Sequence, residues 1–331
     1  MDLDKFFKHW HGKKVLMTGG TGFVGKNFQE IAPALGIELT AIGHKECDLM
    51  DSTQIANFLR MGIKYDYIFH GAAYQGAGDF TLKYPGVQTY RNSLMHMNIL
   101  EGWHLYQPQA KLIGLGSTCS YPGDLPMLRE SDYLTGKLHE SVQYYGLTKM
   151  LMQQGIEAYK DQYKLKGTTV AFATLYGPHD DFDIKRSHVV SALIQKFCDA
   201  TVRGDKEVEV WGDGTQTREL IFVVDQILGM LMAADYEGAL INIGSGVEVT
   251  VANLADMIRD LSESTAEIVY NTDRFVGVMH KVLNVDLAKD RYGWTTEHKL
   301  TTLWHGLRQT IDWYYKTYHS EWYNKQHGGK I

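Results

Sequence analysis

The fold is decided by the stretch Val15-Leu16-Met17-Thr18-Gly19-Gly20-Thr21-Gly22-Phe23-Val24-Gly25. Its first four residues predict a short strand, the glycines predict a tight turn, and a helical pattern follows. In this order the glycines let a pyrophosphate approach the backbone at the positive end of the helix. We therefore predict a dinucleotide-binding turn. Glycine spacing alone is a weak signal, and a purely structural turn is the alternative.

Strands and helices alternate after this turn. Strands are predicted at residues 37–42, 66–70, 111–116 and 168–175, and long helices at 87–106 and 144–164. This alternation is typical of an α/β protein with a doubly wound parallel sheet, the NAD(P)-binding Rossmann fold. We assign residues 1–175, plus about 213–240, to this domain. Residues 176–212 and 241–331 are assigned to a smaller C-terminal α/β lobe for the substrate.

Composition limits the class of protein. The chain has 331 residues, 44% of them hydrophobic, and a formal net charge of −6. It can bury a large core, and its acidic balance offers no basic surface to nucleic acid or an anionic membrane. Three scattered cysteines, Cys47, Cys119 and Cys198, are too few for a disulfide framework or a zinc site. We expect no metal and no membrane span. Because residues 1–14 lack an apolar signal region, we also expect a cytoplasmic protein.

The end of the second strand bears on the choice of cofactor. An NAD enzyme often carries Asp or Glu there, but this chain has Gly43-His44-Lys45. The basic pair favours the 2′-phosphate of NADP, with a solvated loop as the alternative and NAD left open. Asp48 is a candidate to bond the adenine amino group. The predicted cofactor site comprises Gly19, Thr21, Gly22, Phe23, Val24, Gly25, His44, Lys45, Asp48, Leu49, Ala72, Ala73, Tyr145, Lys149 and Leu175.

A second stretch brings four reactive side chains toward one point. Residues 111–116 predict a buried strand, and Ser117 and Cys119 follow at its C-terminal end, the edge where ligands bind in such sheets. If the chain stays extended, these two side chains point to the same side. Tyr145 and Lys149 are four residues apart on a predicted helix and therefore share one face.

These residue types suit the reduction of a carbonyl group. An ammonium beside a phenol favours the phenolate, so Tyr145 is predicted to ionise easily and to exchange a proton with a carbonyl or alcohol oxygen. Ser117 can bond the same oxygen while a nicotinamide exchanges hydride with the carbon. Tyr-x-x-x-Lys arises easily by chance. Its position after a dinucleotide turn is what favours catalysis by Tyr145 and Lys149.

Cys119 decides whether the site does more than reduce. Buried cysteines are usually small apolar fillers, and that interpretation is the alternative here. A thiolate beside a ketone can remove a hydrogen from the neighbouring carbon and so change its stereochemistry. His188, expected in the first turn after a Ser187 N-cap, is the candidate to return a proton from the opposite face. A helix-cap or loop histidine is the alternative for His188.

The chain resembles the extended short-chain dehydrogenases/reductases over roughly residues 14–314. Within them it is most similar to the GDP-L-fucose synthase family, the GDP-4-keto-6-deoxy-mannose 3,5-epimerase/4-reductases. The resemblance lies in Thr-Gly-Gly-x-Gly-Phe-Val-Gly, Leu-Gly-Ser-Thr-Cys-Ser-Tyr-Pro, Tyr-x-x-x-Lys, Leu-Tyr-Gly-Pro-His-Asp-Asp-Phe with Ser-His-Val, Val-Trp-Gly-Asp-Gly-Thr-x-x-Arg-Glu, and Asn-Ile-Gly-Ser-Gly. The first and third motifs mark only the superfamily, whereas Ser-x-Cys-x-Tyr-Pro together with Ser-His-Val is more specific.

The resemblance implies an NADP(H)-dependent enzyme of a GDP-4-keto-6-deoxy sugar, with the sugar nucleotide held in the C-terminal lobe. It implies that Cys119 and His188 epimerise C3 and C5, and that Ser117, Tyr145 and Lys149 serve the reduction at C4. It implies that the substrate is bound by Lys196, Trp211, Arg218 and Lys281, with Lys281 on the diphosphate. It also implies a homodimer formed through helices 87–106 and 144–164.

The sequence departs from the family pattern at four places. The family's Ala-Ala-Lys-Val-Gly-Gly is residues 72–77 here, Ala-Ala-Tyr-Gln-Gly-Ala, and its Gly-x-Pro-Arg-Lys is residues 277–281, Gly-Val-Met-His-Lys. Thr174 replaces an Asn, and Thr21 replaces the usual Arg of the glycine turn. The alternatives are a colitose- or heptose-type epimerase/reductase, a 4-reductase without epimerisation, and a non-catalytic nucleotide-sensing regulator. A 4,6-dehydratase is disfavoured because residues 118–120 are Thr-Cys-Ser rather than Thr/Ser-Asp-Glu.

Overall fold

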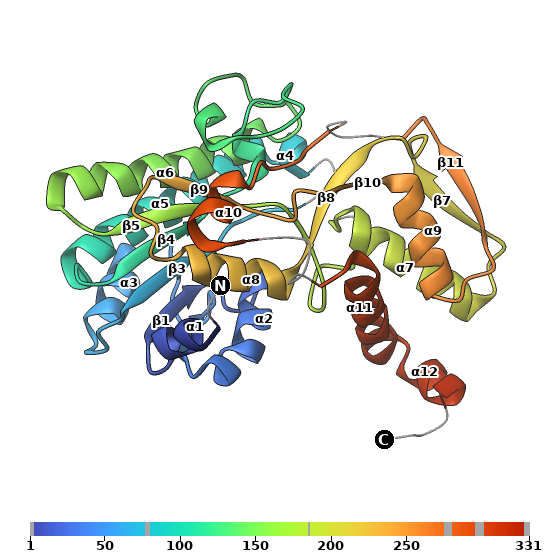
Figure 1. Cartoon of the computed structure of the whole chain (residues 1–331), viewed down its shortest axis with the longest axis horizontal. Coiled ribbons are helices and arrows are strands. Elements are labelled where there is room, and N and C mark those ends of the chain that lie inside the picture. The colour runs from blue at the N-terminus through green and yellow to red at the C-terminus, as the bar shows by residue number, and fades with distance from the viewer. Residues whose placement is uncertain (1–2, 77–79, 185, 275–279, 295–300, 328–331) are drawn as a thin grey trace.

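The computed structural model describes residues 3–76, 80–184, 186–274, 280–294 and 301–327. Two lobes lie side by side along the long axis of the molecule (Figure 1). Of the predicted departures from the family pattern, residue 77 and residues 277–279 lie outside the described residues.

The larger lobe is built on a six-stranded sheet in the order β2-β1-β3-β4-β5-β9, in which all neighbours are parallel. Almost every residue of the inner strands is buried, because helices cover both faces of the sheet. The strand order reverses between β1 and β3, the place where such sheets open a crevice for ligands. The strands are β1 (Lys14–Thr18), β2 (Glu38–Ile42), β3 (Tyr67–His70), β4 (Lys111–Leu115), β5 (Gly167–Phe172) and β9 (Leu240–Ile243).

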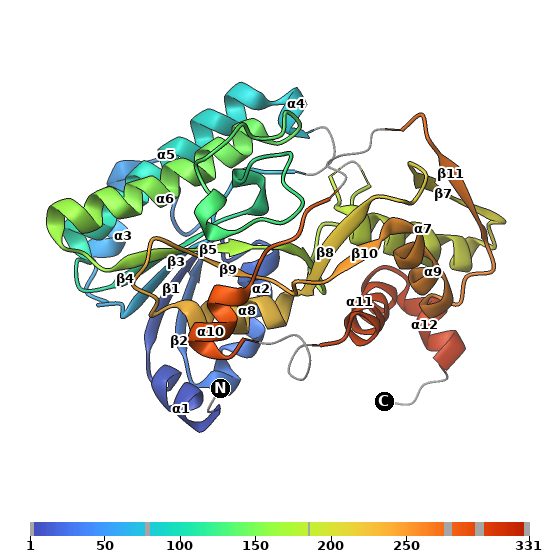
Figure 2. The same cartoon turned by 45° about the horizontal axis from the view of Figure 1, so that its top comes forward.

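Helices form a layer on each side of this sheet. The helices α5 (Pro85–Tyr106) and α6 (Gln143–Tyr163) run together on one face, with α3 (Ser52–Arg60) beside α5 (Figure 2). The other face carries α2 (Phe23–Ile31), α8 (Val223–Ala233) and α10 (Asp286–Tyr292). Shorter elements complete this lobe: α1 (Leu3–Trp10), η1 (Pro33–Leu35), α4 (Phe80–Lys83), η2 (Thr118–Ser120) and η3 (Glu130–Asp132). The predicted doubly wound Rossmann fold is confirmed.

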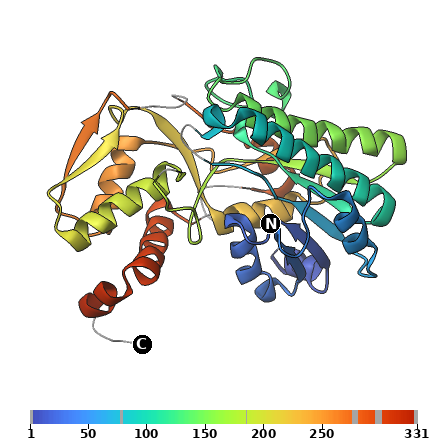
Figure 3. The ribbon, with the colours of Figure 1, turned by 180° about the vertical axis from the view of Figure 1, so that it is seen from behind.

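The smaller lobe has two small sheets and its own apolar core. One sheet has the order β10-β8-β6, and the other pairs β7 with β11. The strands are β6 (Thr174–Tyr176), β7 (Glu207–Trp211), β8 (Thr217–Phe222), β10 (Glu248–Thr250) and β11 (Glu267–Asn271). The helices are α7 (Val189–Arg203), α9 (Val251–Leu261), α11 (Leu303–Tyr318) and α12 (Ser320–His327). Seen from behind, α11 and α12 lie far from the α5–α6 pair (Figure 3).

The predicted domain boundaries are wrong at three elements. The strand β9 pairs with β5 in the large sheet, and α10 packs on β9, although residues 241–331 were expected in the second lobe. The strand β8 pairs with β6 and β10 in the small sheet, although residues 213–240 were expected in the first. Local patterns give strands but not their partners, so a chain that crosses repeatedly between lobes cannot be divided by composition. The predicted strand 168–175 likewise breaks at Ala173, where the chain crosses from β5 to β6.

Candidate active site

The glycine turn between β1 and α2 forms a cradle that larger residues would fill. Gly19 has φ +77°, and a Cβ placed there would lie 2.9 Å from the amide nitrogen of Ala72. A Cβ on Gly20 would lie 2.8 Å from the backbone of Ala41. Gly22 is the N-cap of α2, so the first amide groups of the helix point toward this cradle. The turn therefore fits the diphosphate of a dinucleotide.

One cavity of about 1960 Å³ runs from this turn to the second lobe. Its size and its two-lobed lining suit two extended nucleotide ligands together. Of the residues predicted to bind the cofactor, it is lined by Gly19, Thr21, Gly22, Phe23, Val24, Gly25, His44, Asp48, Leu49, Ala72, Ala73, Tyr145, Lys149 and Leu175.

The predicted basic pair for a 2′-phosphate is only half present in the cavity. His44 lines it with a side chain that is 81% exposed, 3.5 Å from the carboxylate of Asp48. Lys45 is exposed and does not line the cavity. Neighbouring residues of a surface loop point in different directions, which their adjacency in sequence does not show. His44 is therefore the group placed to meet a charge on the ribose.

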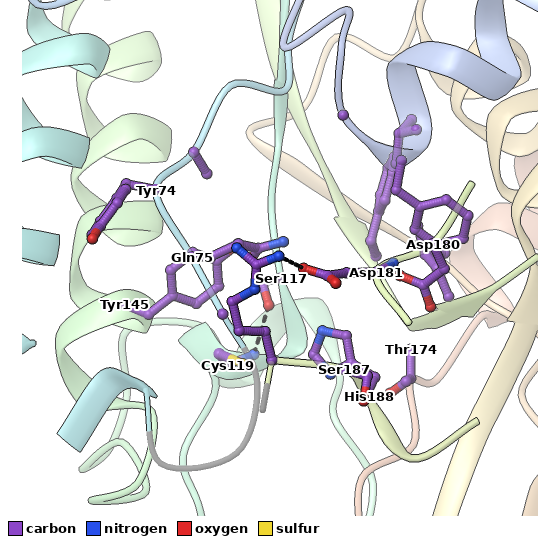
Figure 4. Close-up of a pocket in the computed structure, with 18 of the residues that line it drawn as sticks. Tyr74, Gln75, Ser117, Cys119, Tyr145, Thr174, Asp180, Asp181, Ser187 and His188 are labelled. Atoms are coloured by element: carbon purple, nitrogen blue, oxygen red, sulfur yellow. Dashed lines mark hydrogen bonds and ion pairs between the residues drawn. The ribbon is translucent and has the colours of Figure 1, made fainter. Parts of the chain in front are cut away.

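The reactive side chains meet where β4 ends. Ser117 is the N-cap of η2, and its Oγ accepts the amide hydrogen of Cys119, with 3.1 Å between the heavy atoms. The expected extended chain from Ser117 to Cys119 is therefore wrong, because the chain turns into a 3₁₀ helix. Both side chains still line the cavity together with Tyr145 (Figure 4).

Lys149 lies behind Tyr145 on α6 and is buried. Its ammonium lies 5.8 Å from the centre of the Tyr145 ring and donates a hydrogen bond of 2.7 Å to the carbonyl of Leu115. Burial lowers the pKa of Lys149 to about 8, and Cys119 opposes this shift. Burial, and then Cys119, raise the pKa of Tyr145. The expected easier ionisation of Tyr145 is thus wrong in this structure, which holds the phenol in its proton-donating form.

Cys119 and His188 reach this point from different elements. Cys119 lies in η2 and is half-buried, and Lys281 donates to its sulfur over 3.1 Å. His188 is itself the N-cap of α7, so the predicted Ser187 cap is wrong by one residue. The imidazole faces the open cavity (Figure 4). Its protein surroundings lower the pKa of His188 by desolvation, which Asp180 opposes and Lys281 reinforces.

The loop that carries His188 is fixed to both lobes. His179 meets the carboxylate of Glu30 on α2 at 2.6 Å, and Phe182 stacks on Trp313 of α11 with ring centres 5.8 Å apart. Within the loop, Arg186 pairs with Asp181 at 3.1 Å. The acidic and basic character of this segment was visible in the sequence, but its two anchors were not.

Asp180 is a site residue that sequence reasoning missed. It is buried, accepts a hydrogen bond from Ser191, and lines the cavity beside His188. Burial raises the pKa of Asp180, while His188 opposes that shift. An aspartate next to a second aspartate in a polar loop gives no sign that it is buried.

The far end of the cavity is organised around Trp211, at the end of β7. Lys196 and the guanidinium of Arg274 lie 5.4 and 5.5 Å from the centre of the indole, within range of cation–π attraction. The carboxylate of Glu209 accepts the indole N–H at 3.0 Å and lies 3.2 Å from Arg274. Arg218 also lines the cavity. The structure thus brings Lys196 and Trp211 together. Arg218 precedes Glu219, whose amide bonds the carbonyl of Lys281, while the Lys281 side chain reaches Cys119. Glu209 and Arg274 were not predicted as site residues. The family motifs quoted above give roles only to residues near them in the sequence.

The part of the chain that the structure describes contains neither a membrane-spanning helix nor a group of side chains arranged to bind a metal ion. No helix there is both long and apolar enough to cross a bilayer. Its His, Cys, Asp and Glu side chains form no group of three or more arranged to hold a metal ion.

Known proteins match this chain along most of its length. It is 30% identical to GDP-L-fucose synthase of Escherichia coli (strain K12), over 91% of this chain and 96% of that protein. It is 28% identical to GDP-L-colitose synthase of Yersinia pseudotuberculosis, over 91% and 97%. The crystal structure of a GDP-L-fucose synthetase from Naegleria fowleri bound to NADP superposes with a TM-score of 0.83, at 23% identity, over 94% and 95%.

A protein-family model matches more than half of this chain. Residues 15–244 match the model described as NAD dependent epimerase/dehydratase family, and this range includes the glycine turn, Ser117, Cys119, Tyr145 and Lys149. The predictions of an enzyme and of the extended short-chain dehydrogenase/reductase class are thereby confirmed. The chain belongs to the NAD dependent epimerase/dehydratase family.

Proposed function

We propose that this protein is an NADP(H)-dependent epimerase/reductase of a GDP-4-keto-6-deoxy sugar, like the GDP-L-fucose synthases it resembles. The observation that carries the proposal is the meeting of Ser117, Cys119, Tyr145 and His188 around one part of a cavity that continues to Trp211. Reduction alone needs no thiol and no second proton donor at this place. A base and an acid from different elements suit inversion beside a ketone.

The epimerisation is carried by Cys119 and His188. Cys119 removes the proton from the carbon next to the 4-ketone, first at C3 and later at C5. Hydrogen bonds from Ser117 and Tyr145 stabilise the enolate oxygen that forms. His188 returns a proton from the other face, and its lowered pKa makes the imidazolium a better donor.

The reduction at C4 uses the same oxygen contacts. When bound in the glycine-turn half of the cavity, NADPH supplies the hydride. Tyr145 gives its proton to the oxygen at C4, and the raised pKa of its phenol keeps that proton in place beforehand. Lys149 provides positive charge behind the phenol as the proton leaves.

The nucleotide end of the substrate belongs to the second lobe. Trp211 offers an exposed ring for stacking, and Lys196 and Arg218 offer positive charge for the diphosphate. Because Lys281 lies at Cys119, its predicted role on the diphosphate is the least supported of the four.

Related sugars are the nearest alternatives. A colitose- or heptose-type GDP-4-keto sugar would use the same groups, and a simple 4-reductase would leave Cys119 and His188 idle. Tyr74 and Gln75 line the cavity where the family carries Lys-Val, so this wall is where the native sugar would differ. A non-catalytic nucleotide-sensing regulator is the distant alternative, and the complete Ser117, Tyr145 and Lys149 set argues against it.

We also propose that the protein is a cytoplasmic homodimer. The helices α5 and α6 pack against each other and expose large apolar side chains, with Tyr90 62% exposed on α5 and Leu147 52% exposed on α6. Pairing with a second copy through these helices would cover them.

The test is NADPH oxidation with freshly prepared GDP-4-keto-6-deoxy-mannose, followed by NMR of the product. A product inverted at C3 and C5 and reduced at C4 supports the proposal. Reduction without inversion identifies a 4-reductase. If neither this sugar nor the corresponding 4-keto colitose and heptose precursors oxidise NADPH, the enzymatic proposal fails.

A further inference from the structure

Cys119 has a cationic neighbour that the reduction chemistry does not use. The ammonium of Lys281 lies 3.1 Å from the sulfur, within hydrogen-bonding range for a nitrogen donor and a sulfur acceptor. The other two cysteines, Cys47 and Cys198, are buried in apolar cores away from this contact. A charged group beside one half-exposed thiol marks that thiol as different from the others.

The backbone around Lys281 is held in place from two sides. The amide of Glu219 donates to the carbonyl of Lys281 at 3.4 Å, and the amide of Leu283 donates to the Glu219 carboxylate at 2.8 Å. The amide of Leu128 donates to the carbonyl of Val282 at 2.8 Å. The main chain at Lys281 is therefore held from two segments, which fixes the point from which its side chain reaches Cys119.

Two ammonium groups, of Lys281 and Lys149, act near the sulfur of Cys119, whereas the carboxylate of Asp180 acts on His188. A thiolate gains from neighbouring cations, and the thiolate is the form that removes a proton. The titratable groups packed around this point are Lys149 and Tyr145 on α6, Lys281 on the segment after residue 280, Asp180 in the loop before α7, and His188 at the N-cap of α7.

We propose that Lys281 is a positioning residue that holds Cys119 as the thiolate base of the epimerisation, rather than a ligand of the diphosphate. This inference rests on the proposed function.

The thiolate takes the proton from the carbon next to C4, the electron pair of that C–H bond forms the C=C bond of the enolate, and the carbonyl π pair moves to oxygen. The imidazolium of His188 then protonates the same carbon from the other face, and the carbonyl re-forms. Before the second inversion, water takes the proton from the Cys119 thiol, and His188 takes up a proton from water to become imidazolium again.

One lysine would then set the direction of both proton transfers. Its charge stabilises the anion on Cys119 and disfavours a charged imidazole, so that His188 gives up its proton readily. The lowering of the pKa of His188 by Lys281 agrees with this division of roles. If the Lys281 charge lay on the diphosphate instead, it would neither stabilise the anion on Cys119 nor disfavour a charged His188.

The experiment compares Lys281→Met, Lys281→Arg and Lys196→Met with the wild type. The rate of iodoacetamide alkylation of Cys119 is measured from pH 6 to 9 in the full-length protein without sugar, with the modified residue identified by peptide mass. Lys281→Met should slow alkylation about tenfold at pH 7, and Lys281→Arg should restore most of the rate. Lys196→Met removes a lysine from the same cavity at Trp211 and should leave the rate unchanged. Thermal unfolding shows that each variant is folded.

The second readout separates base activation from substrate binding. With a GDP-4-keto sugar in D₂O, Lys281→Met should lose deuterium incorporation at C3 and C5 about tenfold while NADPH oxidation stays within about threefold. Wild-type alkylation in Lys281→Met, or a rise in substrate KM as its only effect, overturns the inference. If the proposed function is wrong, the wild type will turn over no sugar. The alkylation assay contains no sugar, so its result does not depend on that turnover.

Discussion

The ammonium of Lys149 donates a hydrogen bond of 2.7 Å to the main-chain carbonyl of Leu115, the last residue of β4. This contact ties the helix that carries Tyr145 to the strand that leads to Ser117. It also buries the ammonium, which lowers the pKa of Lys149 to about 8. One side chain therefore links the elements that carry the oxygens of Ser117 and Tyr145 and also places a charge behind the phenol.

The first prediction concerns alkaline pH. Below about pH 8 Lys149 is charged, and above it the side chain loses the proton that supports Tyr145. We expect kcat/KM for NADPH-dependent reduction to fall with an apparent pKa of about 8, and Lys149→Met to lower it by about a hundredfold at pH 7. Initial rates across pH 6–10 measure both. Lys160→Met, on the same helix but paired with Glu157 at 2.7 Å, is the matched control. An alkaline limb that survives in Lys149→Met would contradict the assignment.

The second prediction separates inversion from reduction. Cys119→Ser keeps the small polar shape but replaces the thiol by a hydroxyl that hardly ionises. We expect deuterium incorporation at C3 and C5 to fall by about a hundredfold or more, while reduction of the 4-ketone continues. NMR of the product in D₂O measures the first and NADPH oxidation the second. Full inversion by Cys119→Ser would refute the role of the thiol.

The third prediction concerns stability and Glu219. This carboxyl is buried, its two oxygens accept amide hydrogens of Gly246 and Leu283, and burial raises its pKa to about 7. The folded protein therefore binds the proton more tightly than the unfolded chain. The free energy of unfolding should decrease as pH rises from about 4.5 to 7, by about 3 kcal/mol at most.

Glu219→Gln removes this titration. Urea unfolding at pH 5 and pH 7.5 should therefore show a smaller difference between the two pH values in the variant than in the wild type. An equal difference in both proteins would mean that Glu219 does not titrate in this range. Glu248, a partly exposed carboxylate on the neighbouring strand β10, is the control position for the same substitution.

The fourth prediction tests the glycine cradle. The Cβ of Gly20→Ala would lie 2.8 Å from the backbone of Ala41, so β1 and β2 must separate. We expect NADPH to bind at least about tenfold more weakly, as measured by fluorescence titration. Gly204→Ala, in a loop with nothing within 4 Å of its Cβ, controls for glycine replacement in general, although its φ of +75° will cost some stability. Equal NADPH affinity in Gly20→Ala and the wild type would argue against this turn as the diphosphate site.

The sequence predicted the larger lobe well because its signals are local. A strand, a glycine turn and a helix follow one another directly, and Tyr145 and Lys149 are set by one helical turn. The position of Ser117 at a strand end was also recoverable from the apolar run before it. These features depend on neighbours in the chain and not on distant partners.

The features that were missed depend on contacts between distant segments. Lys281 matched a diphosphate position by motif, but its side chain reaches Cys119, which is 162 residues away in sequence. The strand β9 looks like any short apolar strand, and only its pairing with β5 places it in the large sheet. Asp180 is polar in sequence but buried in space, where the hydroxyl of Ser191, in the first turn of α7, donates a hydrogen bond to its carboxylate.

The loop of residues 179–188 holds on to both lobes, through His179 on Glu30 and Phe182 on Trp313. A change in the spacing of the two lobes would therefore act on the segment that precedes His188. If His188 is the proton donor that we propose, occupation of the glycine-turn half of the cavity and occupation of its sugar half would be linked through this loop. A substitution in α11, far from any ligand, could uncouple inversion from reduction without touching a reacting group.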